Sequence, residues 1–139
     1  MTPHQIDLVQ SSFSKVASIA DTAAVIFYDR LFEIAPQVRP LFHGDMAEKR
    51  RKLMTTLGVV VNGLKDLDAV LPAARALAVK HVGYGVKAEH YAPVGEALIW
   101  TLDRGLVDFT SEVKSAWLAA YGALSGVMIA AAYGEQDAA

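Results

Sequence analysis

Apolar residues recur at intervals of three and four positions along nearly all of this 139-residue chain. That spacing places them on one face of an α-helix. The stretch from 45 to 61 is typical, and no four residues alternate convincingly enough to indicate a β-strand. Glycine and proline fall mostly between the periodic segments. The sequence therefore predicts an all-α domain of six or seven helices, and their unequal lengths argue against a four-helix bundle.

Several helix boundaries carry local signals. Thr2 opens a capping box, with proline at the first helical position after it. Asp21 and Thr110 are predicted to cap two further helices. Pro36 stops a regular helix and predicts a short, tight turn that ends near residues 41–42. These signals divide the chain into helices joined by short connections, with no linker between domains.

The composition excludes several classes of function. The net charge is −2, from 13 basic and 15 acidic residues, which gives no electrostatic case for a nucleic-acid partner. Cysteine is absent, so disulfides, cysteine-based zinc sites and iron–sulfur clusters are excluded. The first residues lack the pattern of a signal peptide, and no apolar run approaches the ~18 residues of a membrane span. We therefore expect a cytoplasmic protein with no membrane partner.

His81 is the sharpest single feature of the sequence. It continues the apolar stripe of Val70, Ala74 and Leu77, so its imidazole is predicted to point into the interior. One interpretation is a core histidine that is hydrogen-bonded to a carbonyl. The other is an axial ligand to haem iron, with the Leu77 carbonyl, four residues back, holding the second ring nitrogen. The remaining histidines fall near predicted element ends, which disfavours a multi-histidine zinc site.

Longer stretches of the chain resemble a known family. They are FYDRLFEIAPQVRPLF, KRRKLM, LAVKHVGYGV, EHYAPVGEAL and FTSEVKSAWLAAYG. They resemble single-domain bacterial haemoglobins and the globin half of flavohaemoglobins, and more distantly neuroglobin, over residues 4–132. Pro36, Phe42 and His81 occur in the order and spacing of the marks of that family. The resemblance implies a single globin domain over residues 1–139, with the three-over-three helical fold and haem b.

The resemblance also implies a role for each site residue. His81 would be the proximal iron ligand, and Phe42 would stack on the porphyrin. Tyr28 would donate a hydrogen bond to O2, which stabilises a bound ligand by ~1–2 kcal/mol in a dry pocket. Lys49 and Leu53 would shape the distal pocket. The remaining expected haem contacts are Leu77, Val86 and Tyr91.

Lys49 departs from the family, which has histidine or glutamine at that position. A charged ammonium is costly to bury unpaired, so one interpretation is that the side chain lies over the haem with its charge in water or on a propionate. The alternative is a neutral amine that binds iron as a sixth ligand. Most of the basic run, residues 49–52, is expected to be solvated, and two haem propionates nearby would account for part of it.

The proximal side departs as well. Tyr91 matches a tyrosine that supports the proximal imidazole in flavohaemoglobins. The glutamate that completes that relay falls on Ala132 here, and Glu135 lies three residues further on. Without the carboxylate the histidine pushes less electron density onto iron. This weakens the case for peroxidase-like chemistry and for efficient NO dioxygenation.

Three functions follow from the resemblance. The first is reversible binding of O2, and of CO and NO, for oxygen binding, storage or delivery. The second is a haem redox enzyme such as an NO dioxygenase, which would need a separate reductase because the sequence stops at Ala139. The third is a gas or redox sensor, or a haem-free regulatory globin. The sequence leaves both a monomer and a homodimer open.

Overall fold

Helices account for all the regular structure in the computed structural model, which describes residues 2–42, 44–83, 85–106 and 109–133. This part of the chain contains no β-strand, and the all-α prediction is confirmed. The elements are α1 (Pro3–Ala17), α2 (Ala20–Ile34), η1 (Pro36–Leu41), α3 (Met46–Asn62), α4 (Leu67–Gly83), η2 (Ala88–His90), α5 (Tyr91–Gly105) and α6 (Ser111–Tyr133). The two η elements are short 3-10 helices.

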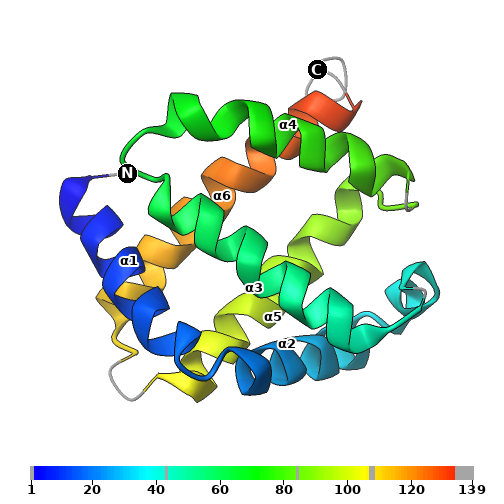
Figure 1. The fold of residues 1–139 in the computed structure, drawn as a ribbon, viewed down its shortest axis with the longest axis horizontal. Coiled ribbons are helices and arrows are strands. Elements are labelled where there is room, and N and C mark those ends of the chain that lie inside the picture. Colours follow the sequence, from blue (N-terminus) through cyan, green and yellow to red (C-terminus); the bar gives the residue numbers. More distant parts are fainter. Residues whose placement is uncertain (1, 43, 84, 107–108, 134–139) are drawn as a thin grey trace.

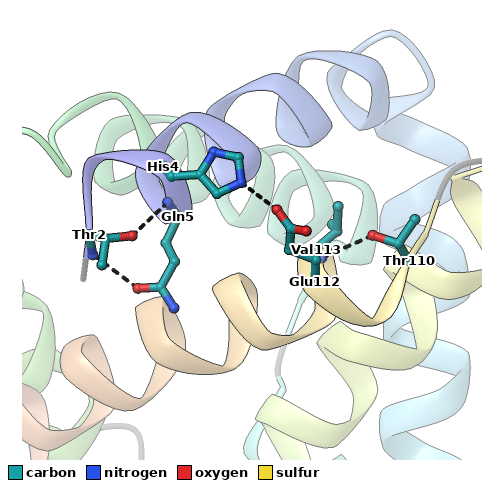
Figure 2. Close-up of polar contacts among 6 residues, drawn as sticks. All are labelled: Thr2, His4, Gln5, Thr110, Glu112 and Val113. Atoms are coloured by element: carbon teal, nitrogen blue, oxygen red, sulfur yellow. Dashed lines mark hydrogen bonds and ion pairs between the residues drawn. The ribbon is translucent and has the colours of Figure 1, made fainter.

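The capping signals at the starts of α1 and α6 are confirmed. Thr2 Oγ1 accepts from the Gln5 amide at 3.1 Å, and the Gln5 side chain accepts from the Thr2 amide at 3.0 Å. Thr110 Oγ1 accepts from the Val113 amide at 3.2 Å. Figure 2 shows both caps, with an ion pair between α1 and the first turn of α6 lying between them. The two helix starts are thus tied to each other as well as capped.

The predicted cap at Asp21 is wrong. Helix α2 begins at Ala20, so Asp21 lies inside its first turn, and Ile19 precedes the helix without a side-chain cap. The Asp21 carboxylate still lies at the helix N-terminus, where a negative charge is favourable. It also lies 3.6 Å from Nε of Arg50 on α3.

The helices pack as two layers, which confirms the predicted three-over-three arrangement. Helix α2 packs on α5 and on α3, whereas α4 packs on α6 and α1 packs on α6 and α3. Figure 1 shows α3 running diagonally across the front of the molecule, with α5 and α6 behind it and α4 along the upper edge. The consecutive helices α3 and α4 therefore have different main partners.

The apolar interior divides into two clusters of buried residues. The main cluster joins α1, α2, α3, α5 and α6, and its fully buried Val9, Leu31 and Leu102 are the largest such side chains. The second cluster lies between α4, the start of α5 and α6 and consists of Ala74, Ala78, Tyr91 and Met128. The split follows from the different partners of α3 and α4.

One helix of the described chain qualifies as a membrane span by length and composition alone. It is α6 over Ser111–Ala132, although no such segment was expected from the sequence. Val113, Ala116 and Trp117 of this helix belong to the main core cluster, and α6 packs on α1, α4 and α5. A core helix meets the same test, so the apolar character of α6 fits its place in the fold.

Candidate functional site

The His81 imidazole is partly buried and held by its own helix. Its Nδ1 lies 2.8 Å from the Leu77 carbonyl oxygen, which confirms the partner expected from the spacing. A carbonyl only accepts, so Nδ1 carries the proton and Nε2 is the nitrogen that a metal would take. Burial lowers the pKa of His81, and the bond to Leu77 opposes this shift. A lowered pKa favours the neutral imidazole that metal binding requires.

The predicted contacts on the His81 side come together. The Tyr91 ring stacks on the His81 ring with centroids 6.4 Å apart and planes 25° apart. Gly85, with a φ of +90°, turns the chain after α4 so that the Val86 amide donates to the His81 carbonyl at 3.0 Å. Leu77 and Val86 are both partly buried against the second cluster. Four of the predicted residues thus lie at one end of α4.

Tyr28 and Phe42 come together in a second group of residues, a cluster of aromatic rings on α2 and at the end of η1. The Tyr28 and Phe42 centroids are 5.3 Å apart at an interplanar angle of 77°. Phe27 packs edge-on to Tyr28 at 5.1 Å, and Phe32 packs edge-on to Phe42 at 5.3 Å. Aromatic rings prefer this edge-to-face arrangement to a direct face-to-face stack. These contacts hold Phe42, the residue directly after η1, against the side chains of α2. The sequence predicted this position at the end of the short turn.

The Tyr28 hydroxyl points to α3, the helix that carries Lys49 and Leu53. Its oxygen lies 3.5 Å from the Lys49 carbonyl oxygen, which is the long limit for a hydrogen bond. Burial raises the pKa of Tyr28 to about 12, and the nearby Arg50 guanidinium opposes the shift. The phenol therefore keeps its proton at neutral pH. A protonated hydroxyl with a weak partner is available as a donor to another acceptor.

Lys49 and Leu53 are one helical turn apart on α3, and both are partly buried. Two neighbours in the basic run have carboxylate partners: Arg50 with Asp21 at 3.6 Å, and Lys52 with Glu48 at 3.2 Å. Nothing in the sequence predicted a particular role for Arg50, yet its Nε is buried. Within the basic run, Lys49 and Arg50 are therefore partly buried, whereas Arg51 and Lys52 are exposed to solvent.

The residues present fit a flat, apolar group that carries a metal. Phe42 and Leu53 are partly buried against the main cluster, whereas Leu77 and Val86 are partly buried against the second one. These four apolar side chains keep exposed surface, and covering such surface stabilises a complex. His81 adds one nitrogen ligand beside Leu77 and Val86. Haem has the required shape, apolar faces and open axial position.

The carboxylate of the flavohaemoglobin relay has no counterpart at its expected position. Ala132 packs with its methyl group against the cluster of Tyr91 and Met128. Glu135 lies outside the described residues. Ala132 therefore supplies packing and no charge to the proximal side.

Tyr121 is a residue of this site that the sequence analysis did not identify. Its hydroxyl donates to the Tyr91 carbonyl at 2.6 Å. The one signal in the sequence is Gly95, a glycine inside α5 that would ordinarily weaken a helix.

Comparison with known proteins gives consistent matches. The family model described as Globin matches residues 25–128, which is more than half of the chain. The Flavohemoprotein of Bordetella parapertussis is 30% identical over 133 residues, which cover 93% of this chain and 33% of that protein. That of Xylella fastidiosa is 31% identical over 131 residues. The chain thus spans about a third of the length of these curated relatives.

Solved structures match over nearly the full chain. A bacterial globin of Campylobacter jejuni is similar with a TM-score of 0.84 and 24% identity, covering 98% of this chain and 99% of that one. At this identity the likeness establishes the fold.

Proposed function

This chain belongs to the globin family, and we propose that it binds haem b with His81 as the axial ligand and reversibly binds O2 at ferrous iron. The proposed role is oxygen binding, storage or delivery, with CO and NO as further ligands. The observation that carries the proposal is the partly buried His81 imidazole, whose Nδ1 donates to the Leu77 carbonyl at 2.8 Å and whose pKa is lowered by burial. A ligating histidine needs that kind of support at its second nitrogen.

Each of the other residues has a part that follows from its contacts. Haem, when bound, would supply an iron that takes diatomic gases. Phe42, packed edge-to-face against the rings of both Tyr28 and Phe32, would hold the porphyrin from one side. Tyr28 would turn its proton from the Lys49 carbonyl to the gas. Leu53 would keep water out of the pocket, where a hydrogen bond is stronger.

The enzymatic alternative is NO dioxygenation. It is favoured by the flavohemoprotein relatives, of which this chain covers only a third. Ala132, which offers no proximal carboxylate, speaks against it. Turnover would require electrons from a reductase, and we propose such a partner only for this alternative. A gas or redox sensor is the third candidate.

The proposal also covers the extent of the domain, its location in the cell and its oligomeric state. Residues 1–139 would form a single globin domain in the cytoplasm, as a monomer or a homodimer. Neither nucleic acid nor membrane is proposed as a partner.

One spectroscopic series tests the main proposal. The purified chain is loaded with haem, and absorbance is recorded in the ferric, ferrous, ferrous–CO and oxygenated states. We expect one haem per chain and an O2 spectrum that reverts when the gas is removed. Failure to take up haem contradicts the proposal. Consumption of NO with a supplied reductase, at a rate far above that of free haem, would favour the enzyme.

Lys49→Ala is expected to leave the ferrous spectrum high-spin and five-coordinate, as in the parent chain. The reason is that the Lys49 side chain is only partly buried on a basic, largely solvated stretch of α3, so its ammonium can reach water. Absorbance and resonance Raman spectra of the ferrous protein at neutral pH check this. Lys52→Ala, on the same helix, is the matched control. A low-spin ferrous spectrum that Lys49→Ala converts to high-spin would identify the amine as the sixth ligand.

A further inference from the structure

The Arg50 guanidinium is partly enclosed where α3 packs on α2, unlike the basic residues that follow it. The Arg50 side chain is 26% exposed, and its Nε is fully buried and makes no hydrogen bond within the described part of the chain. Arg51 and Lys52 are exposed to solvent. A buried donor without a hydrogen bond costs free energy, and the cost is greater for a charged group. A buried group of this kind in a folded protein calls for a reason.

Asp21 compensates the charge of Arg50 only in part. Its Oδ1 lies 3.6 Å from Arg50 Nε, and this is the one ion pair of Arg50 among the described residues. The Asp21 side chain is 87% exposed, so water screens its charge and weakens the attraction. The same carboxylate lies in the first turn of α2, where the positive end of the helix dipole also attracts it. The arrangement leaves positive charge at the contact between α2 and α3.

Tyr28 lies close enough to interact with this charge. Its hydroxyl oxygen is 3.5 Å from the carbonyl oxygen of Lys49, the residue before Arg50, across the packed helices α2 and α3. Burial raises the pKa of Tyr28 to about 12, and the Arg50 guanidinium opposes this rise. A cation near a phenol polarises the O–H bond and makes the hydroxyl a stronger hydrogen-bond donor. Arg50 therefore strengthens the donor of the candidate gas site.

We propose that Arg50 is a specificity-determining residue of the candidate gas site and that it favours ligands that carry negative charge. Its charge would act on such a ligand directly and through the Tyr28 hydroxyl. At ferric iron the ligand class is a small anion such as azide, fluoride or nitrite. This inference rests on the proposed function, because these ligands bind at haem iron. A purely structural role for Arg50 predicts lost stability and no change in the preference for anions.

The test compares Arg50→Gln with Arg50→Lys and with Arg51→Gln in the ferric, haem-loaded protein. Arg50→Gln keeps a planar polar group and removes the charge, whereas Arg50→Lys keeps the charge. Arg51→Gln, the matched control, removes the same charge from the exposed neighbour. Absorbance titrations at pH 8 give the dissociation constants of azide, an anion, and of imidazole, which is mostly neutral at that pH. Thermal unfolding gives the stability of each variant.

Azide affinity is expected to fall about five- to twenty-fold in Arg50→Gln, while imidazole affinity stays the same. This is the size expected for a unit charge that acts over ~10–15 Å through an effective dielectric constant of ~20. Arg50→Lys and Arg51→Gln should retain most of the azide affinity. An equal loss for azide and imidazole in Arg50→Gln overturns the proposal, as does an equal loss of azide affinity in Arg51→Gln.

Asp21→Asn gives a second test that does not depend on the folding of Arg50→Gln. It removes the exposed carboxylate that partly balances Arg50 and leaves the guanidinium in place. Azide affinity should therefore rise, by about two- to five-fold for an exposed ion pair. An unchanged or lower azide affinity in Asp21→Asn counts against the proposal.

A chain that takes up no haem contradicts the proposed function, and the haem-free protein then decides on Arg50 by NMR. The ¹³C chemical shift of Tyr28 Cζ at neutral pH reports how strongly the phenol is polarised. We expect this shift to change in Arg50→Gln and to stay the same in Arg51→Gln. An unchanged shift in Arg50→Gln, or the same change in both variants, overturns the role of Arg50.

Discussion

His81→Ala is expected to purify with little or no haem and without a stable Soret band. The substitution removes the imidazole that Leu77 orients at 2.8 Å, and with it the one protein–iron bond that the proposed site requires. The variant should also be less helical and less stable than the loaded parent. A ligand present at about 1,000 times its dissociation constant adds about 4 kcal/mol to the free energy of unfolding, and the variant loses that contribution. Haem-to-protein ratio, absorbance and circular dichroism measure these effects.

Two controls separate ligation from folding. His4→Ala removes an exposed histidine that pairs with Glu112 on another part of the surface, and it should retain full haem (Figure 2). His81→Gly leaves a space at the same position, so added imidazole should restore the Soret band if the iron bond is what was lost. A His81→Ala protein with full haem and an unchanged Soret band would show that another group binds the iron.

The fold was predictable where its signals are local. The cap at Thr2 and the turn at Pro36 depend on neighbours within three or four positions, and both are confirmed. The cap at Asp21 failed because α2 begins at Ala20, so the cap position is Ile19, two residues before the predicted one. The Asp21 carboxylate pairs instead with Arg50, 29 positions away, and no local pattern encodes that contact.

The candidate site divides in the same way. The bond between His81 and Leu77 joins positions four apart in one helix, so periodicity predicted it. In the run from 49 to 52 all four residues are basic, and helical spacing alone did not indicate that Arg50 lies near Tyr28. The contact from Tyr121 to Tyr91 joins α6 to α5. The only sign of it in the sequence is Gly95, a glycine inside a helix.

The Tyr28 ring and its hydroxyl contribute separately to the proposed gas site. The ring is fixed by edge contacts with Phe27 and Phe42, at centroid distances of 5.1 Å and 5.3 Å. The hydroxyl has only the long contact of 3.5 Å to the Lys49 carbonyl. Tyr28→Phe should therefore remove the donor without moving the ring or changing the space in the pocket. Any effect on gas binding then reports the hydrogen bond.

Tyr28→Phe is expected to speed O2 dissociation about five- to thirty-fold, which corresponds to a hydrogen bond worth ~1–2 kcal/mol. CO dissociation should hardly change, because CO is less polar when bound. In the parent chain the O2 rate should stay flat from neutral pH to about pH 10, since the pKa of Tyr28 is raised to about 12 and only loss of the proton above it would end donation. Flash photolysis and ligand replacement measure both gases. Tyr121→Phe is the matched control: it removes a tyrosine hydroxyl on the His81 side, so any effect it has should act on both gases together. Equal changes for O2 and CO in Tyr28→Phe would mean that the ring, and not the hydroxyl, governs access to the iron.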